Sequence, residues 1–557
     1  MQRLLTGVRP YLALTFLCLL LYLPGLSGLP PMDRDESRFA QATRQMLETG
    51  DFVTIHYQDT MRTKKPVGIY WLQSAAVSMF GDAEGTEIWP YRLPSVLGAW
   101  IAVLGVFHFG RTMFGRQAAF LAAALLASSM LLVAEAHQAK TDAVLLACTV
   151  VAQGALGRAY LRELGKVPVG LGVALAFWLA QGVGILVKGP LVPLVSLLTF
   201  LALWIVDRRV AWFLGLRPLL GLLVVTAMVV PWGVAISKAT GGTFLGEAVR
   251  SDLLPKLLGA QEMHGAPPGY YLLLVTLTLW PGSLLLWPAL VRAFRRRRDP
   301  AVRLCLAWAG PAWIVFELVP TKLPHYVLPT YPALCLLLGA GLLVLRDGTY
   351  ELLSSRPAAM WYAVWGVLGV GLAIGLGTAP GFLGPEAGTW TFTPWVLPTV
   401  VGALVAGVGP ILLLRDRKFL QAVWTSIAGA VIVHITAFTL IAPDLDALWL
   451  SSRVETMILE QVPDPQGAVA AAGFHEPSLV FHLGTDTLLT DGPGAARHIL
   501  AHPGALAVVG VTEQPAFHEQ LRAMGRPVDV LGTVDGFNYS RGRRETLGLY
   551  RAAPSGG

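Results

Sequence analysis

Two short segments of the sequence, one with carboxylates between arginines and one with paired lysines, offer groups that together can bind a phosphate and assist a group transfer. Residues 33–38 read Asp-Arg-Asp-Glu-Ser-Arg, and residues 64–66 read Lys-Lys-Pro. A carboxylate beside cations can act as a general base or orient a nucleophile, and lysine and arginine bind phosphate groups. The first segment also has a simpler explanation, because acidic residues stabilise the positive end of a helix dipole. Taken alone, neither segment establishes catalysis.

Further ionisable residues stand beside long apolar stretches, where each is costly unless it has a partner or a task. Several have ordinary explanations as well: a tight turn at Lys188-Gly189-Pro190, or side chains reaching from a span end toward water. We expect a functional site because these segments fall on one side of the predicted membrane. The residues concerned are His137, Lys140, Asp142, Lys188, His264, Lys322, His325 and Tyr326.

The elements that position these residues are predicted to be membrane helices. Of the 557 residues, 54% are hydrophobic and only 14% are charged, whereas a soluble protein carries about 25% charged residues. The sequence predicts an all-α polytopic membrane protein with about thirteen spans, since each crossing needs about 20 apolar residues. The expected spans are 8–28, 92–112, 118–136, 142–161, 168–187, 189–206, 219–237, 269–291, 303–320, 325–346, 358–379, 394–414 and 419–442.

The orientation follows from the short loops, because arginine and lysine concentrate in alternate ones. The positive-inside rule then predicts a cytoplasmic N-terminus. The loops 29–91 and 238–268 and the tail 444–557 are expected in the periplasm, with residues 1–443 forming the multispanning domain. The net charge of +7 is explained by these loops, so we expect membrane lipids and no nucleic acid as partners. The four cysteines lie in apolar runs, which argues against disulfides.

The segments outside the spans show their own periodicities. In the first loop, Phe39, Thr43, Met46 and Leu47 recur at helical spacing and predict an interfacial helix. The tail 444–557 alternates strand-like and helix-like runs, which indicates a small α/β domain. His434, inside the last span, is expected to form a hydrogen bond between helices. The tail's expected strands are 468–474, 479–483, 505–511, 528–533 and 547–551, and its expected helices are 452–462, 494–502 and 516–524.

Five motifs occur in an order that resembles a known family. They are Asp35-Glu36-Ser37-Arg38-Phe39; Lys65-Pro66; Leu186-Val187-Lys188-Gly189-Pro190; Lys322-Leu323-Pro324-His325-Tyr326; and Glu476-Pro477-Ser478-Leu479-Val480-Phe481. The ordered set resembles the lipid-linked sugar transferases of the aminoarabinose transferase type. These group with protein O-mannosyltransferases among the multispanning (GT-C) glycosyltransferases.

The resemblance implies inverting transfer of one sugar, such as aminoarabinose or a uronic acid, from undecaprenyl phosphate. The implied acceptor is lipid A, lipopolysaccharide or another acceptor at the periplasmic face of the bacterial inner membrane. It implies catalytic roles for Asp35, Glu36 and Asp142. It also implies that the carrier phosphate or substrate is bound by Arg38, Lys65, Lys188, His264, Lys322, His325 and Tyr326.

One departure from the family pattern concerns a metal ion. Aminoarabinose transferases have a glutamate before Lys-Pro, which the resemblance associates, together with a histidine matching His264, with a divalent metal. This chain has Lys64 there, and an ammonium group is no metal ligand, so the sequence argues against the metal and against aminoarabinose. Two other functions stay open: a polyprenyl-linked sugar flippase or transporter, and a protein O-glycosyltransferase of the same fold.

Overall fold

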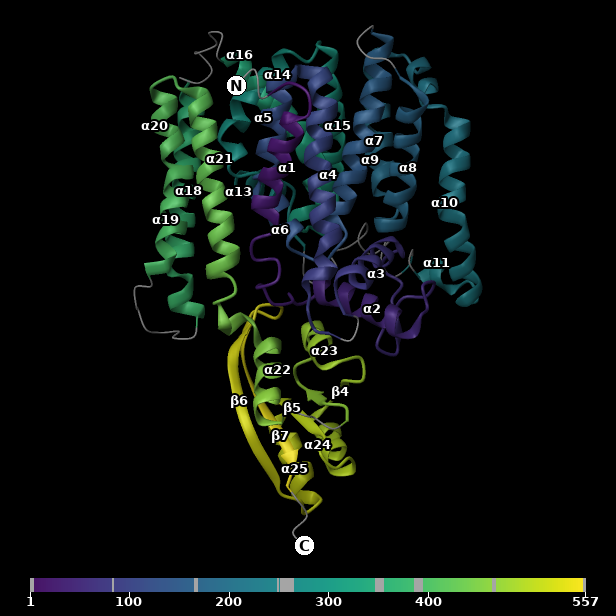
Figure 1. The fold of residues 1–557 in the computed structure, drawn as a ribbon, viewed down its shortest axis with the longest axis vertical. Coiled ribbons are helices and arrows are strands. Elements are labelled where there is room, and N and C mark those ends of the chain that lie inside the picture. Colours follow the sequence, from purple (N-terminus) through teal and green to yellow (C-terminus); the bar gives the residue numbers. More distant parts are fainter. Residues whose placement is uncertain are drawn as a thin grey trace.

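The computed structural model describes residues 5–82, 85–164, 169–247, 250, 265–345, 355–384, 394–462 and 467–553. A body of roughly aligned helices lies above a small C-terminal domain, with the first loop between the two (Figure 1). The helices of the body are α1 (Arg9–Tyr22), α4 (Trp89–Phe114), α5 (Arg116–Ala127), α6 (Met130–Ala136), α7 (Asp142–Glu163), α8 (Leu171–Lys188), α9 (Leu191–Asp207), α10 (Pro218–Ala239), α11 (Thr243–Glu247), α13 (Tyr270–Thr278), α14 (Leu286–Arg295), α15 (Pro300–Leu318), α16 (Tyr331–Leu345), α18 (Arg356–Leu383), α19 (Leu397–Gly407), α20 (Gly409–Arg415) and α21 (Phe419–Thr436).

The body has the apolar helices of a polytopic membrane protein. Within the described ranges, 8 helices are long and apolar enough to cross a membrane, or up to 10 if each bent pair forms one span. Shorter apolar helices, among them α1 and α9, lie at other expected spans. The count of thirteen therefore stays a prediction, while the mostly helical membrane fold is confirmed.

Two expected spans are bent rather than straight. The pair α5 and α6 meets at an angle of 60°, and α13 meets the segment Gly282–Arg295 at 119°. At the first bend, the Ser128 hydroxyl donates to the carbonyl of Ala124 and the Ser129 hydroxyl to that of Leu126. Serine side chains that bond to nearby backbone offer an alternative to continued helix. The bend carries the last turn of α6, with Glu135, to the end of the body that faces the first loop.

The first loop forms a compact layer over that end of the body. It contains α2 (Asp35–Thr49), the antiparallel strands β1 (His56–Tyr57) and β2 (Thr60–Met61), and α3 (Gly68–Phe80). The helix expected from Phe39, Thr43 and Met46 is present as α2, and these three side chains are buried. Phe39 and Met46 pack in one cluster with Tyr70 of α3 and Val187 of α8, which fixes the loop on the body.

The C-terminal domain is built on a five-stranded sheet with the order β4-β3-β5-β7-β6. The β3, β4 and β5 strands run parallel, and β7 is antiparallel to β5 and β6. One apolar cluster joins the sheet to α22 and α23, and another joins it to α24 and α25. The elements are α22 (Leu450–Gln461), β3 (Ala470–Ala472), α23 (Pro477–Leu483), β4 (Leu488–Thr490), α24 (Gly492–Ala501), β5 (Leu506–Gly510), α25 (Gln514–Ala523), β6 (Val528–Asn538) and β7 (Arg543–Ala552).

The strand expected at 479–483 is wrong, because this segment is helix α23. Periodicity cannot separate a short buried strand from a short buried helix. Pro477 stands in the first turn, where proline is favoured because its missing N–H has no intrahelical partner there. The proline was the available signal for a helix.

The C-terminal domain contacts the first loop through hydrogen bonds close to the start of α2. The backbone N–H of Asp33 donates to the Tyr539 hydroxyl over 2.6 Å, and the Ser478 hydroxyl donates to the Asp33 carboxylate. The Arg34 guanidinium donates to the carbonyl of Ser540. Arg34 has a φ of +68°, which is uncommon for a residue with a Cβ. The domain therefore holds a strained turn directly before Asp35.

One smaller expectation, a helix-connecting hydrogen bond of His434, is also confirmed. His434 of α21 lies with its Nε2 3.0 Å from the carbonyl oxygen of Ser128 at the end of α5, so it connects two helices. All four cysteines are buried and unpaired with one another.

Candidate active site

The start of α2 is fixed to the body by a buried ion pair between Glu36 and Arg92. Both side chains are fully buried, and the Arg92 guanidinium reaches both Glu36 oxygens at 2.8 and 2.9 Å. The same oxygens accept the backbone N–H groups of Met32 and Ala139 at 2.8 and 2.7 Å. Glu36, expected beside Asp35 in catalysis, is thus occupied by internal partners. Its position suits a role in placing Asp35.

Asp35 itself faces the solvent at the first position of α2. Desolvation by the surrounding protein raises its pKa, but the charges of Lys140, Arg62 and Lys65 outweigh this effect and hold the pKa below its usual value. An opposite charge within a few ångströms favours the ionised form of a carboxylate. Asp35 is therefore a carboxylate in a positive environment, open to a ligand.

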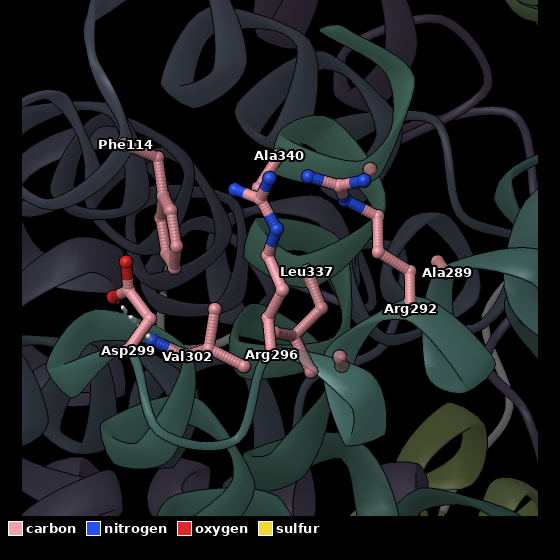
Figure 2. Close-up of a pocket in the computed structure, with 10 residues that line it drawn as sticks. Phe114, Ala289, Arg292, Arg296, Asp299, Val302, Leu337 and Ala340 are labelled. Atoms are coloured by element: carbon pink, nitrogen blue, oxygen red, sulfur yellow. Dashed lines mark hydrogen bonds between the residues drawn. The ribbon is translucent and has the colours of Figure 1, made fainter. Parts of the chain in front are cut away.

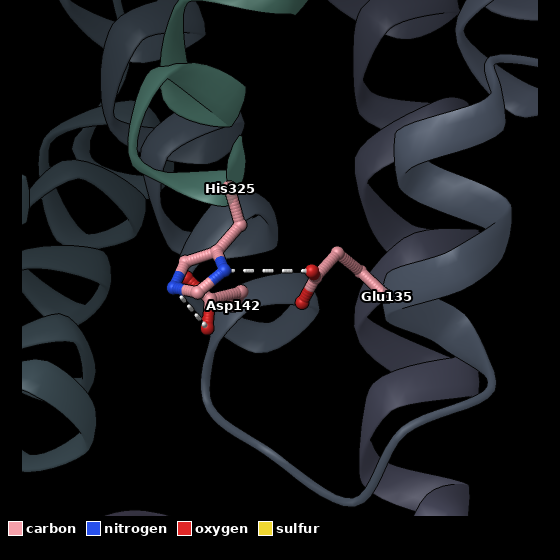
Figure 3. A group of neighbouring side chains, drawn as sticks. All are labelled: Glu135, Asp142 and His325. Atoms are coloured by element: carbon pink, nitrogen blue, oxygen red, sulfur yellow. Dashed lines mark ion pairs between the residues drawn. The ribbon is translucent and has the colours of Figure 1, made fainter. Parts of the chain in front are cut away.

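A network of buried charges lies next to Asp35, between α6, α7, α8 and the 3₁₀ helix Pro324–Thr330. The Lys140 ammonium lies 2.9 Å from Glu135, and the Lys188 ammonium lies 2.6 Å from Asp142. His325 stands between the two carboxylates at 3.8 Å from each (Figure 3). The structure thus brings together three residues expected for the site: Asp142, Lys188 and His325.

An aromatic side chain borders this network. The Tyr326 ring lies below the Lys188 ammonium, with 5.6 Å from the nitrogen to the ring centroid, and packs edge-on against His325 at 5.1 Å. Cations are attracted to the face of an aromatic ring. Tyr326 therefore belongs to the same group, as the motif Lys-Leu-Pro-His-Tyr led us to expect.

Lys322 has a different environment from the other lysines of the predicted site. It is buried, and its ammonium donates to the carbonyls of Glu317 and Val319 at 2.8 and 2.6 Å. These carbonyls lie at the C-terminal end of α15, where backbone acceptors lack helical partners and the helix dipole is negative. In this structure the Lys322 ammonium therefore closes the end of a helix.

The remaining expected residues surround Asp35 or lie outside the described ranges. Lys65 is half-buried and lowers the pKa of Asp35 by its charge. Arg38 is half-buried one turn after Asp35, and its charge lowers the pKa of Tyr57, which burial raises to about 12. Lys64 is exposed. His264 lies outside the described residues.

Sequence reasoning missed three residues that shape the site. Glu135 was hidden inside an expected span, and Arg62 and Arg92 received no role; Lys140 was among the residues expected near the site but was given no partner. The signal for Glu135 and Arg92 was an ionisable residue at a span end, which needs a partner. Arg62 donates to the Tyr70 hydroxyl over 2.9 Å and stacks on Phe39 at 4.9 Å, contacts that only the folded loop creates.

The group Glu135, Asp142 and His325 could be considered for a metal ion, because one ligand atom from each lies within 4.8 Å of the others. The two carboxylates, however, already have the ammonium groups of Lys140 and Lys188 at 2.9 and 2.6 Å. Two negative charges are thus balanced by two positive ones, and a divalent cation would have to approach both ammoniums. The donor set fits an internal ion-pair network and not a metal centre.

Comparison with known proteins supports the resemblance expected from the motifs. A family described as dolichyl-phosphate-mannose-protein mannosyltransferase matches residues 64–234, the segment with Lys65, Asp142 and Lys188. An undecaprenyl phosphate-alpha-4-amino-4-deoxy-L-arabinose arabinosyl transferase from Aeromonas hydrophila is 27% identical over 340 residues, or 60% of each chain. The protein of that description from Pseudomonas paraeruginosa is 30% identical over 330 residues, or 58% of each chain. The match spans about three fifths of the length of these curated relatives.

Solved structures share the fold over a larger part of the chain. The crystal structure of ArnT from Cupriavidus metallidurans bound to undecaprenyl phosphate has a TM-score of 0.73 at 20% identity and covers 98% of both chains. An oligosaccharyltransferase from Archaeoglobus fulgidus, tethered with an acceptor peptide, has a TM-score of 0.52 at 12% identity, covering 94% of this chain and 69% of that chain. The GT-C fold expected from the motifs is therefore confirmed.

Proposed function

We propose that this chain transfers a single sugar from undecaprenyl phosphate to lipid A or another acceptor at the periplasmic face of the inner membrane. The observation that carries the proposal is Asp35, an accessible carboxylate held at the start of a helix among Lys140, Arg62 and Lys65. The fold shared with ArnT and the relatives named as arabinosyl transferases support it.

The cations around Asp35 would bind the phosphate that links the sugar to its carrier. As the bond to the sugar breaks, negative charge grows on this phosphate, and fixed cations stabilise that charge more in the transition state than in the ground state. Lys65 and Arg62 lie on the same loop as Asp35. Lys140 and Lys188 lie beside them, but their charges are balanced by Glu135 and Asp142, so the net positive charge at this site comes from the loop.

The lowered pKa of Asp35 favours one of two roles for its carboxylate. A base whose pKa is far below the working pH removes a proton poorly. An ionised carboxylate can still orient an acceptor and stabilise positive charge that develops at the anomeric carbon. This role suits an acceptor that is itself ionised, such as a phosphate group of lipid A. We infer that Asp35 orients the acceptor, whose oxygen attacks the anomeric carbon with inversion.

The orientation is part of the proposal. Positive loops alternate along the sequence, so the first loop and the C-terminal domain, which lie at one end of the body (Figure 1), would both face the periplasm. Single cysteines in place of the exposed residues Thr60 and Arg544 should react with an impermeant maleimide in intact spheroplasts. Protection of either site, with labelling only after lysis, would reverse the orientation; the natural cysteines are all buried.

The activity is tested with purified protein reconstituted into liposomes. Undecaprenyl phosphate carrying aminoarabinose or a uronic acid is supplied with lipid A, and the products are analysed by mass spectrometry. We expect the mass of lipid A to increase by one sugar and undecaprenyl phosphate to be released. The Asp35→Asn variant should give neither product. Movement of the intact donor across the bilayer without product would favour a flippase and contradict the proposal.

A further inference from the structure

A cavity with two arginines in its wall lies at the end of the helical body away from the first loop and the C-terminal domain. Its volume is about 290 Å³, and it opens where α4 and α14 end and α15 begins, against the last turns of α16 (Figures 1 and 2). Ligand pockets have volumes of about 300–1,000 Å³. This cavity therefore has room for a small polar headgroup.

Two arginines provide the positive charge of the cavity. Arg292 lies in the last turn of α14 and Arg296 follows four residues later, a spacing that puts both on one helix face. Figure 2 shows the two side chains running roughly parallel, with their guanidinium groups on the same side of the cavity. Among the described residues, neither guanidinium has a carboxylate within ion-pairing distance.

The one acidic side chain at the rim is already in use. Asp299 begins α15, and its carboxylate accepts the backbone N–H groups of Ala301 and Val302 at 2.9 and 3.4 Å. This N-cap bond ties the carboxylate to the helix start. Two guanidiniums and one carboxylate leave a net charge of +1, which matches one singly charged anion.

The other walls are apolar, and this decides the kind of anion. Phe114, Ala289, Val302 and Leu337 line the cavity, and apolar walls would make it a poor site for a fully hydrated ion. A lipid presents a phosphodiester to the arginines and its glycerol and upper acyl carbons to such walls. Basic pockets between membrane helices are known to bind lipid headgroups in this way.

We propose that Arg292 and Arg296 form a binding site for the singly charged phosphodiester headgroup of an anionic phospholipid, such as phosphatidylglycerol. The site lies on the membrane face opposite to Asp35 and is independent of the proposed sugar transfer. Phosphatidylethanolamine carries the same phosphodiester but adds an ammonium group, which would lie close to the two guanidiniums. The structure therefore favours the anionic lipid over the zwitterionic one.

The experiment measures lipid binding to the detergent-purified chain by native mass spectrometry. Phosphatidylglycerol and phosphatidylethanolamine with the same acyl chains are titrated, together with inorganic phosphate alone. We expect phosphatidylglycerol to bind first, with affinity reduced about tenfold in Arg292→Gln and again in the double variant with Arg296→Gln, since each loses a charge-assisted bond. Arg292→Lys with Arg296→Lys should retain most of the binding and shows that the cavity still folds.

Two exposed arginines outside the cavity give the matched control. Arg295→Gln with Arg298→Gln removes the same charge from the same stretch of chain, and this variant should bind phosphatidylglycerol like the unchanged protein. Equal loss in both double variants would show a general surface-charge effect and overturn the proposal. Equal binding of the two lipids, or displacement of the lipid by millimolar phosphate, would overturn it as well.

Discussion

Lys188 donates a hydrogen bond to Asp142 over 2.6 Å, and the pair joins the end of α8 to the start of α7. Both side chains are at least nine-tenths buried. Taking two charges out of water is costly, and removing one partner leaves the other charge buried without compensation. A residue expected to bind phosphate and a residue expected to be acidic in catalysis are therefore one structural unit.

We predict that Lys188→Met destabilises the protein by about 3–5 kcal/mol, because Asp142 then stays buried without its main counter-ion. The double variant with Asp142→Asn should recover most of this loss. Lys238→Met, which removes an exposed lysine near the end of α10, is the control and should change little. Thermal unfolding in detergent gives the stabilities, and the sugar-transfer assay shows whether the double variant also recovers activity. Equal stability of all four proteins would mean that the pair contributes nothing.

Asp35 is predicted to affect turnover and not stability. Its carboxylate is accessible, so Asp35→Asn removes a charge without leaving a buried partner. We expect transfer to fall by at least about 10²-fold if the carboxylate does electrostatic or acid–base work, with an unchanged melting temperature. Asp59→Asn changes an exposed carboxylate of the same loop and should have no effect. Near-normal transfer in a folded Asp35→Asn protein would contradict a catalytic role. The carboxylate would then serve only to stabilise the positive end of the dipole of α2.

The adjacent residue should show the opposite pattern. Glu36 neutralises Arg92 inside the protein, where both are fully buried. Glu36→Gln leaves the guanidinium charged and uncompensated, at a cost of about 3–5 kcal/mol. We expect low yield and a lower melting temperature, while the fraction that folds retains transfer activity within about tenfold. A stable but inactive Glu36→Gln protein would instead give Glu36 a direct catalytic role.

Lys65 and Lys322 were both expected to bind phosphate. Melting temperature and turnover, measured on a variant of each, can distinguish a structural role from a role in catalysis. Lys322 donates to the carbonyls at the end of α15, so Lys322→Met should lower the melting temperature more than it lowers turnover per folded molecule. Lys65 acts on Asp35 through its charge, so Lys65→Met should reduce turnover by about ten- to a hundredfold, the range for one charge-assisted bond. A large loss of turnover in a stable Lys322→Met protein would return Lys322 to the phosphate site.

The sequence predicted the parts of the fold that depend on local pattern. Apolar runs identified the membrane helices, and the spacing of Phe39, Thr43 and Met46 identified α2. The alternation of strand-like and helix-like runs after residue 444 identified the C-terminal sheet domain. The exceptions have local causes as well. The bend at Ser128 and Ser129 was missed because serine is common inside membrane helices and hydropathy does not detect a change of direction.

The site was predicted less completely, because pairing is a property of the folded chain. Hydropathy and motifs selected Asp35, Asp142, Lys188 and His325, and the structure brings the last three together. They could not show that Glu36 is neutralised by Arg92, a residue more than fifty positions away. Asp35 is accessible, whereas Glu36 is neutralised, and this difference decides which of the two can act on a substrate. It follows from tertiary contacts alone.

The last prediction concerns Asp33, which connects the first loop to the C-terminal domain. Burial raises its pKa to about 6, with a further contribution from Glu476, although the Ser478 hydroxyl donates to it and lowers the pKa. A carboxyl that binds its proton more tightly in the folded protein than in the unfolded chain adds stability at low pH, and this is lost as the pH rises from about 4 to about 6. Protonation of Asp33 should therefore raise the melting temperature of the unchanged protein as the pH falls through this range. Asp33→Asn mimics the neutral acid and can still accept from Ser478, so this variant should be the more stable protein at pH 7 and should equal it near pH 4. Asp59→Asn serves again as the exposed control, and a constant difference between Asp33→Asn and the unchanged protein across this range would show that Asp33 does not titrate there.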